Sequence, residues 1–93
     1  MVRLHDELDA RSAGRTARRL LRLIETEPDV LEVDLTELRH LSPAGCAALF
    51  TALRAVRTRG TRLIITHPSH QAAAVMRQIG LTYALTHRQA GTE

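Results

Sequence analysis

Apolar residues recur along the first third of the chain at the spacing of an amphipathic helix. After Asp9 they follow one another in steps of one, three or four residues, and the pattern stops just before Pro28. The spacing predicts a helix over about residues 10–26. Its apolar stripe consists of Ala13, Ala17, Leu20, Leu21 and Ile24.

Short apolar runs between the helical patterns predict buried strands. Residues 30–35 and 61–66 are rich in β-branched and aliphatic side chains, as is typical of strands covered on both faces. We expect the strand over 30–35 to lie in the centre of the sheet. Residues 2–4 and 81–85 would add outer strands, and a polar, flexible tail would follow from about residue 86.

Two further helices are predicted in the second half of the chain. Ser42 and Pro43 suit the N-cap and first position of a helix that Gly60 ends. Ser69 caps a third helix, which Gly80 closes. The predicted core positions are Cys46, Leu49, Phe50, Leu53 and Val56 in the second helix, and Ala72, Val75, Met76 and Ile79 in the third.

The alternation of strands and helices predicts an α/β fold with right-handed crossover connections. We therefore expect a mostly parallel sheet of four to five strands flanked by helices. The chain has 93 residues, 44% of them hydrophobic, which suits one domain over residues 1–93.

Composition excludes several classes of protein. A single cysteine, Cys46, cannot form an internal disulfide, and no apolar run is long enough to span a membrane, so we expect a cytoplasmic protein without a membrane partner. The net charge is +3, but one Phe and one Tyr provide no stacking platform, which disfavours nucleic acid as a partner. Arg11, Arg15, Arg18 and Arg22 form a basic ridge on the first helix, which suits a solvated face or an acidic partner.

Catalytic and cofactor motifs are not found in the sequence. His67 and His70 have no third ligand at the spacing of a zinc site, and the glycines form no phosphate-binding loop. No Ser, His and Asp occur in a recognisable catalytic order. Cys46 lies on the core stripe of its helix and is expected to be a buried thiol. We therefore expect no enzyme activity, no metal and no cofactor.

Residues 34–45, DLTELRHLSPAG, resemble the STAS signature D-L-S-x-V-x-x-I-D-S-S-G without a gap. Residues 7–9, 59–63 and 79–81 extend the similarity in the order and at the distances of that family. The resemblance covers most of the chain. It implies a regulatory protein-binding domain similar to anti-sigma factor antagonists, which bind a histidine-kinase-like anti-sigma factor and are released by phosphorylation.

The sequence departs from the STAS pattern at two places. The family has a further N-terminal strand before residues 7–9, so either the sheet lacks this strand or the true start of the protein lies upstream. The family's aspartate falls on Ser42, its phosphorylated serine on Pro43 and its second serine on Ala44, while Gly45 is retained. Proline has no hydroxyl, so phosphorylation at the usual position is excluded. Ser42 remains the alternative acceptor, although as an N-cap it should bond to the N–H of Ala44 or Gly45.

The resemblance places the partner-binding surface on the predicted loop 36–41 and the first turns of the second helix. Asp34 either belongs to this surface or closes a buried strand by accepting backbone N–H groups. A second interpretation keeps the fold but makes the chain a scaffolding module of a larger complex without a phospho-switch. An exposed sheet edge would also allow a homodimer. The predicted partner-binding residues are Asp34, Thr36, Glu37, Arg39, His40, Ser42, Pro43, Ala44 and Gly45.

Overall fold

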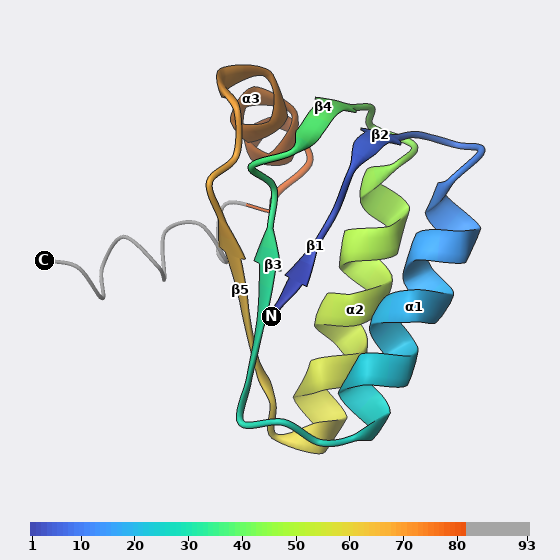
Figure 1. Cartoon of the computed structure of the whole chain (residues 1–93), viewed down its shortest axis with the longest axis vertical. Helices are drawn as coiled ribbons and strands as arrows, with labels where there is room; N and C mark the ends of the chain where they lie inside the picture. Colours follow the sequence, from blue (N-terminus) through green and yellow to red (C-terminus); the bar gives the residue numbers. More distant parts are fainter. Residues whose placement is uncertain (82–93) are drawn as a thin grey trace, which may run out of the picture.

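The computed structural model describes residues 1–81 of the chain. Strands and helices alternate along these residues, as Figure 1 shows. Their order is β1 (Val2–Arg3), β2 (Asp6–Leu8), α1 (Ala13–Glu25), β3 (Val30–Asp34), β4 (Leu38–Leu41), α2 (Cys46–Arg59), β5 (Arg62–Thr66) and α3 (His70–Gln78).

All strand pairs of the described residues are parallel, which confirms the predicted fold class. The larger sheet has the order β1-β3-β5, with β3 in the centre as expected. The strands do not form one continuous sheet, because β2 and β4 pair separately. The ladder of the larger sheet ends where the Leu4 N–H donates to the Asp34 carbonyl and the Leu35 N–H donates to the Thr66 carbonyl. The segments that follow β1 and β3 then turn, and they pair again with each other as β2 and β4.

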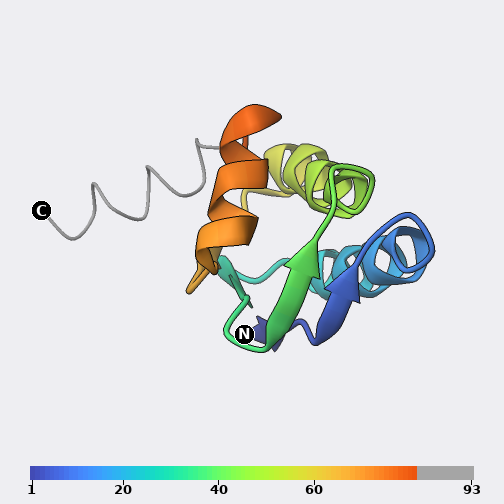
Figure 2. The ribbon, with the colours of Figure 1, turned by 90° about the horizontal axis from the view of Figure 1, so that it is seen from above.

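The helices pack on this scaffold in two places. Figures 1 and 2 show α1 and α2 side by side next to the larger sheet, with α3 near β4 at the other side. Leu31 and Val33 of β3 point into the core, whereas Val30 is exposed. The predicted core faces of α2 and α3 are confirmed, since every member is buried or packs against the core. On α1, Leu23 packs against the core, whereas Leu21, which was predicted to lie on the core stripe, is only half-buried. The 3.6-residue period alone does not decide between these two positions.

The first helix begins three residues later than predicted. Residues 9–12 form a turn in which the Asp9 carboxylate accepts the N–H groups of Arg11 and Ser12 at 3.0 and 3.2 Å. The Ser12 hydroxyl accepts the Asp9 N–H and donates to the Glu7 carbonyl. Such local bonds compete with helix formation. The N–H of Ser12 is the main cause that lowers the pKa of Asp9.

Two corrections concern the segment between β3 and α2. Residues 36–41 are not a loop, because Leu38–Leu41 form β4 beside β2. The regular helix begins at Cys46, since residues 43–45 form a tighter turn in front of it. Gly60 has φ of 72° and ends α2 in the left-handed region, as predicted.

The predicted last strand lies largely outside the described residues. Leu81 is buried and belongs to a turn, and residues 82–85 and the predicted tail from 86 are not among the described residues.

Candidate protein-interaction surface

The stretch that carries the STAS-like signature forms one continuous part of the surface. A turn at Thr36 and Glu37 leads into β4, and the turn over residues 43–45 leads into α2; β4 and the start of α2 lie at the upper end of Figure 1. Leu38 and Leu41 anchor β4 in the core. We call the exposed side chains of this stretch the 36–44 surface; they are Thr36, Glu37, Arg39, His40, Pro43 and Ala44.

The other three predicted partner-binding residues are not freely exposed. Asp34 is 5% exposed, Gly45 is buried and Ser42 is half-buried. These three residues therefore support the backbone of the 36–44 surface and are not freely accessible to a partner.

Asp34 closes β3 through a network of hydrogen bonds. Its Oδ1 accepts the Thr36 N–H at 2.9 Å and the Thr36 hydroxyl at 2.6 Å, and its Oδ2 accepts the Arg3 Nε–H at 3.1 Å. His67 Nδ1 lies 3.6 Å from Oδ1. The hydrogen bonds from Thr36, helped by Arg3, lower the pKa of Asp34 to about 2. The carboxylate is therefore ionised, fixes the turn before β4, and fits the structural interpretation made from the sequence.

Ser42 holds the turn before α2 through the predicted hydrogen bond, although the N-cap of the helix is Gly45 and not Ser42. The Gly45 N–H donates to Ser42 Oγ at 3.0 Å, while the N–H groups of Cys46, Ala47 and Ala48 bond to carbonyls within the preceding turn. Pro43 is exposed at this helix start and has no hydroxyl. The position that would carry phosphate in the signature thus presents only a pyrrolidine ring.

Gly45 is explained by close approach rather than by its backbone angles. Its φ is −64°, which any residue can adopt. A Cβ atom here would lie 2.0 Å from the Leu8 carbonyl oxygen and 2.8 Å from the Asp9 nitrogen. The backbone of β2 therefore rests directly on the turn that leads into α2.

Gln71 supports β4 and was missed by sequence reasoning. Its Oε1 accepts the Leu41 N–H at 3.0 Å, and its Nε2 donates to the Leu41 carbonyl at 2.6 Å. No local signal points to this pair, because the two residues are 30 positions apart.

Glu37 of the 36–44 surface contacts a histidine from the segment between β1 and β2. His5 Nδ1 lies 2.7 Å from Glu37 Oε1. The Cys46 thiol is fully buried, and this burial raises its pKa, so it is not set up as a nucleophile.

Within residues 1–81 no group of three or more His, Cys, Asp or Glu side chains could hold a metal ion. In the same residues, no helix is both long and apolar enough to cross a membrane.

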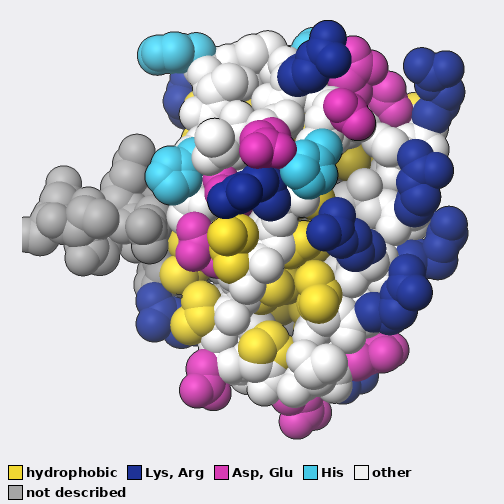
Figure 3. All heavy atoms as spheres, in the orientation of Figure 1, with side chains coloured by type: hydrophobic (Ala, Val, Ile, Leu, Met, Phe, Trp, Pro, Cys, Tyr) yellow, Lys and Arg dark blue, Asp and Glu magenta, His cyan; other side chains and the backbone are white. Residues whose placement is uncertain are grey.

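The predicted basic ridge is exposed along α1 and the turn before it. Arg11, Arg15, Arg18 and Arg22 all lie at the surface, and Figure 3 shows a column of cationic side chains along this side of the molecule.

Comparison with known families agrees with this geometry. The model of the STAS domain matches residues 1–89, and no curated protein sequence matches the chain significantly. The match spans the parallel strands, the signature segment and all three helices described above. This chain belongs to the STAS domain family.

Proposed function

We propose that this STAS domain is a non-catalytic regulatory module, similar to anti-sigma factor antagonists, that binds a histidine-kinase-like anti-sigma factor in the cytoplasm. The 36–44 surface is the proposed docking site. The observation that carries the proposal is the exposed Pro43 in the turn before α2, in the position of the family's phosphoacceptor.

Pro43 changes how the interaction would be regulated. The first turn of a helix accommodates a phosphate because its N–H groups carry partial positive charge. A phosphoserine there would add about −1.5 to −2 charge and repel a partner docked on a neutral helix end. Pro43 cannot be modified in this way, so binding should persist when the kinase has ATP.

Ser42 is a poor replacement as phosphoacceptor. Its Oγ already accepts the Gly45 N–H at 3.0 Å, and the residue is half-buried. Transfer of a phosphoryl group to this oxygen would require the hydrogen bond that holds the turn before α2 to break. We therefore expect Ser42 to stay unmodified.

The proposal is tested by retention of partners from host lysate on the immobilised protein, with ATP or with ADP. We expect an anti-sigma kinase to be retained equally under both conditions. The double variant Ser42→Asp/Pro43→Ser restores the family's aspartate and phosphoacceptor serine and should be released by ATP, whereas the matched variant Pro43→Ala should behave like the native protein. Phosphate on Ser42 of the native protein, or its release by ATP, would contradict the proposal.

A scaffolding role without any switch is the second candidate. It is favoured by the loss of the last two serine hydroxyls of the signature, at Pro43 and Ala44. Retention of other complex subunits in place of a kinase would support it. The predicted homodimer remains a prediction as well: β1 is an edge strand of the larger sheet within residues 1–81, and sedimentation of the purified protein measures the association directly.

A further inference from the structure

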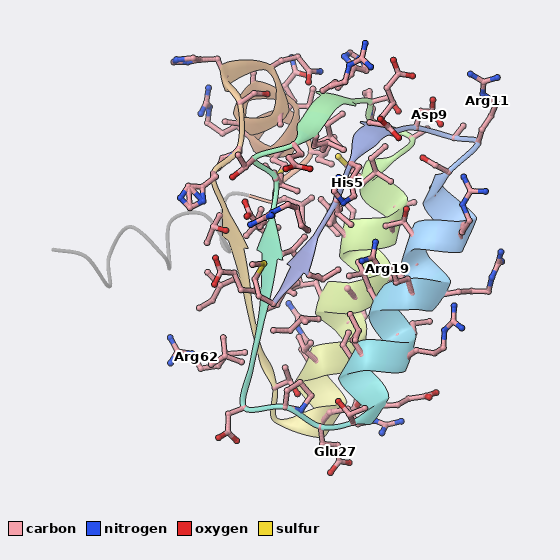
Figure 4. All side chains as sticks on the ribbon, in the orientation of Figure 1. His5, Asp9, Arg11, Arg19, Glu27 and Arg62 are labelled. Atoms are coloured by element: carbon pink, nitrogen blue, oxygen red, sulfur yellow. The ribbon has the colours of Figure 1, made fainter. Side chains whose placement is uncertain are left out.

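A recess of about 200 Å³ lies between α1 and the segment from β1 to β2, next to the 36–44 surface. Its apolar lining comes from Leu4, Leu8 and Leu38, which are buried core residues. Polar and charged residues line the rest. Figure 4 shows His5 and Arg19, two of the lining residues, on the same face of the molecule.

The α1 side of the recess is cationic. Arg15 and Arg19 are one helical turn apart, so their side chains share one side of the helix. Both are exposed, and within residues 1–81 neither has an ion pair or a side-chain hydrogen bond. Thr16 lies between them in the sequence and also lines the recess. Guanidinium groups bind carboxylates through two parallel hydrogen bonds, so this side suits a carboxylate.

The β2 side of the recess is acidic. Asp6 and Glu7 both line it, although successive residues of a regular strand face opposite sides. The register of β2 against β4 shifts between these two residues, and Asp6 has φ of 62°. This irregularity explains how both can face the recess. Among the described residues, neither carboxylate takes part in an ion pair.

We propose that this recess binds a small zwitterion, namely a free α-amino acid. Its carboxylate would bind to Arg15 and Arg19, and its ammonium group to Asp6 and Glu7. The ligand's side chain would lie on the leucine lining. A ligand with both charges satisfies both walls at once, whereas a simple anion would face the two carboxylates and a simple amine would face the two guanidinium groups. His5 is already engaged by Glu37, so it borders the recess without supplying a charge to the ligand.

The test is a titration of the isotope-labelled protein with single amino acids of different side-chain size, followed by amide NMR. At least one amino acid should cause saturable shifts at Asp6, Glu7 and Thr16. Acetate, inorganic phosphate and methylamine each match only one wall and should bind at least about tenfold more weakly.

Matched variants separate the recess from the general charge of α1. Arg15→Ala/Arg19→Ala should abolish the saturable shifts, while Arg18→Ala/Arg22→Ala removes the same charge from the same helix outside the recess and should preserve them. Asp6→Asn/Glu7→Gln changes the other wall with little change in shape and should also abolish binding, which keeps the test valid if the arginine variant unfolds.

Three results would overturn the proposal. The first is the absence of saturable shifts with every amino acid up to about 10 mM. The second is an equal loss of binding in Arg18→Ala/Arg22→Ala, and the third is phosphate binding as tightly as the best amino acid, which would indicate an oxyanion site.

Discussion

Asp34 shows how one side chain can join the core of the fold to its surface. The carboxylate is 5% exposed, yet it accepts hydrogen bonds from Thr36 and Arg3 and lies close to His67. A buried charge is tolerated only when such partners replace water. Asp34 thereby fixes the turn that carries the chain from β3 to β4.

Acidification should weaken the protein through Asp34. Its pKa falls from 3.8 to about 2 on folding, so its contribution to stability is present above pH 4 and is lost as the pH falls toward 2. Near pH 3 the unfolded state should bind about 0.8 proton more at this residue than the folded state. Asp34→Asn should lower stability at neutral pH and reduce the pH dependence of unfolding in this window, measured by urea denaturation at a series of pH values.

Glu25→Gln is the matched control for this measurement. It also removes one carboxylate, but from an exposed position at the end of α1. An Asp34→Asn protein whose unfolding keeps the native pH dependence between pH 2 and 4 would show that the network around Asp34 is not what the acid disrupts.

At the scale of elements, β4 depends on support from both sides. It pairs with β2 on one side, and on the other side Gln71 of α3 bonds to both backbone groups of Leu41. The Gln71 amide thus makes with Leu41 the two hydrogen bonds that a neighbouring strand would make with its backbone. Both the pairing with β2 and the two bonds from Gln71 therefore hold the exposed residues of β4 in place.

Gln71→Ala should destabilise the protein by about 1–3 kcal/mol, because it leaves the buried N–H and carbonyl of Leu41 without their partner. Urea denaturation measures the loss, and hydrogen exchange should show faster exchange at the Leu41 amide. Gln78→Ala, on an exposed position of the same helix, should change little. Equal effects of both variants would refute the role assigned to Gln71.

At the scale of the whole molecule, the smaller sheet is joined to α2 where β2 rests on the turn before this helix. The Ser42 N–H donates to the Leu8 carbonyl at 3.0 Å, and Gly45 leaves room for the same carbonyl. This contact joins the start of the chain to the signature segment. The position of the 36–44 surface relative to the recess depends on it.

Gly45→Ala should therefore destabilise the fold by at least about 2 kcal/mol, because backbone atoms of Leu8 and Asp9 must move to admit the methyl group. Gly14→Ala is the matched control, since the only atom near its added Cβ is the flexible end of Arg18 at 3.8 Å. In a helix this second change should stabilise by up to about 1 kcal/mol. Thermal unfolding of both variants should give shifts of opposite sign, and a neutral Gly45→Ala would disprove the close approach.

Features with local causes were predictable from the sequence. The helices, the central strand and the α/β class follow from periodicity, which depends on neighbouring residues alone. The cap at Ser69, the hydrogen bond from the Gly45 N–H to Ser42 Oγ and the left-handed Gly60 are equally local, and the structure confirms them. The N-cap of α2 itself is Gly45 and not Ser42 as predicted. The boundary of α1 was predicted less well, because the side-chain bonds of Asp9 and Ser12 outweigh helix propensity there.

The sequence by itself determined the class of fold, the core faces of α2 and α3, and the absence of a hydroxyl at position 43. Only the tertiary structure decided that residues 38–41 form a strand and that residues of opposite charge line one recess. It also decided that Arg3 bonds to Asp34 and that Gln71 bonds to Leu41. The physical reason is sequence separation. A hydrogen bond between residues about thirty positions apart leaves no trace in the local pattern, and exists only once the sheets and helices have brought its partners together.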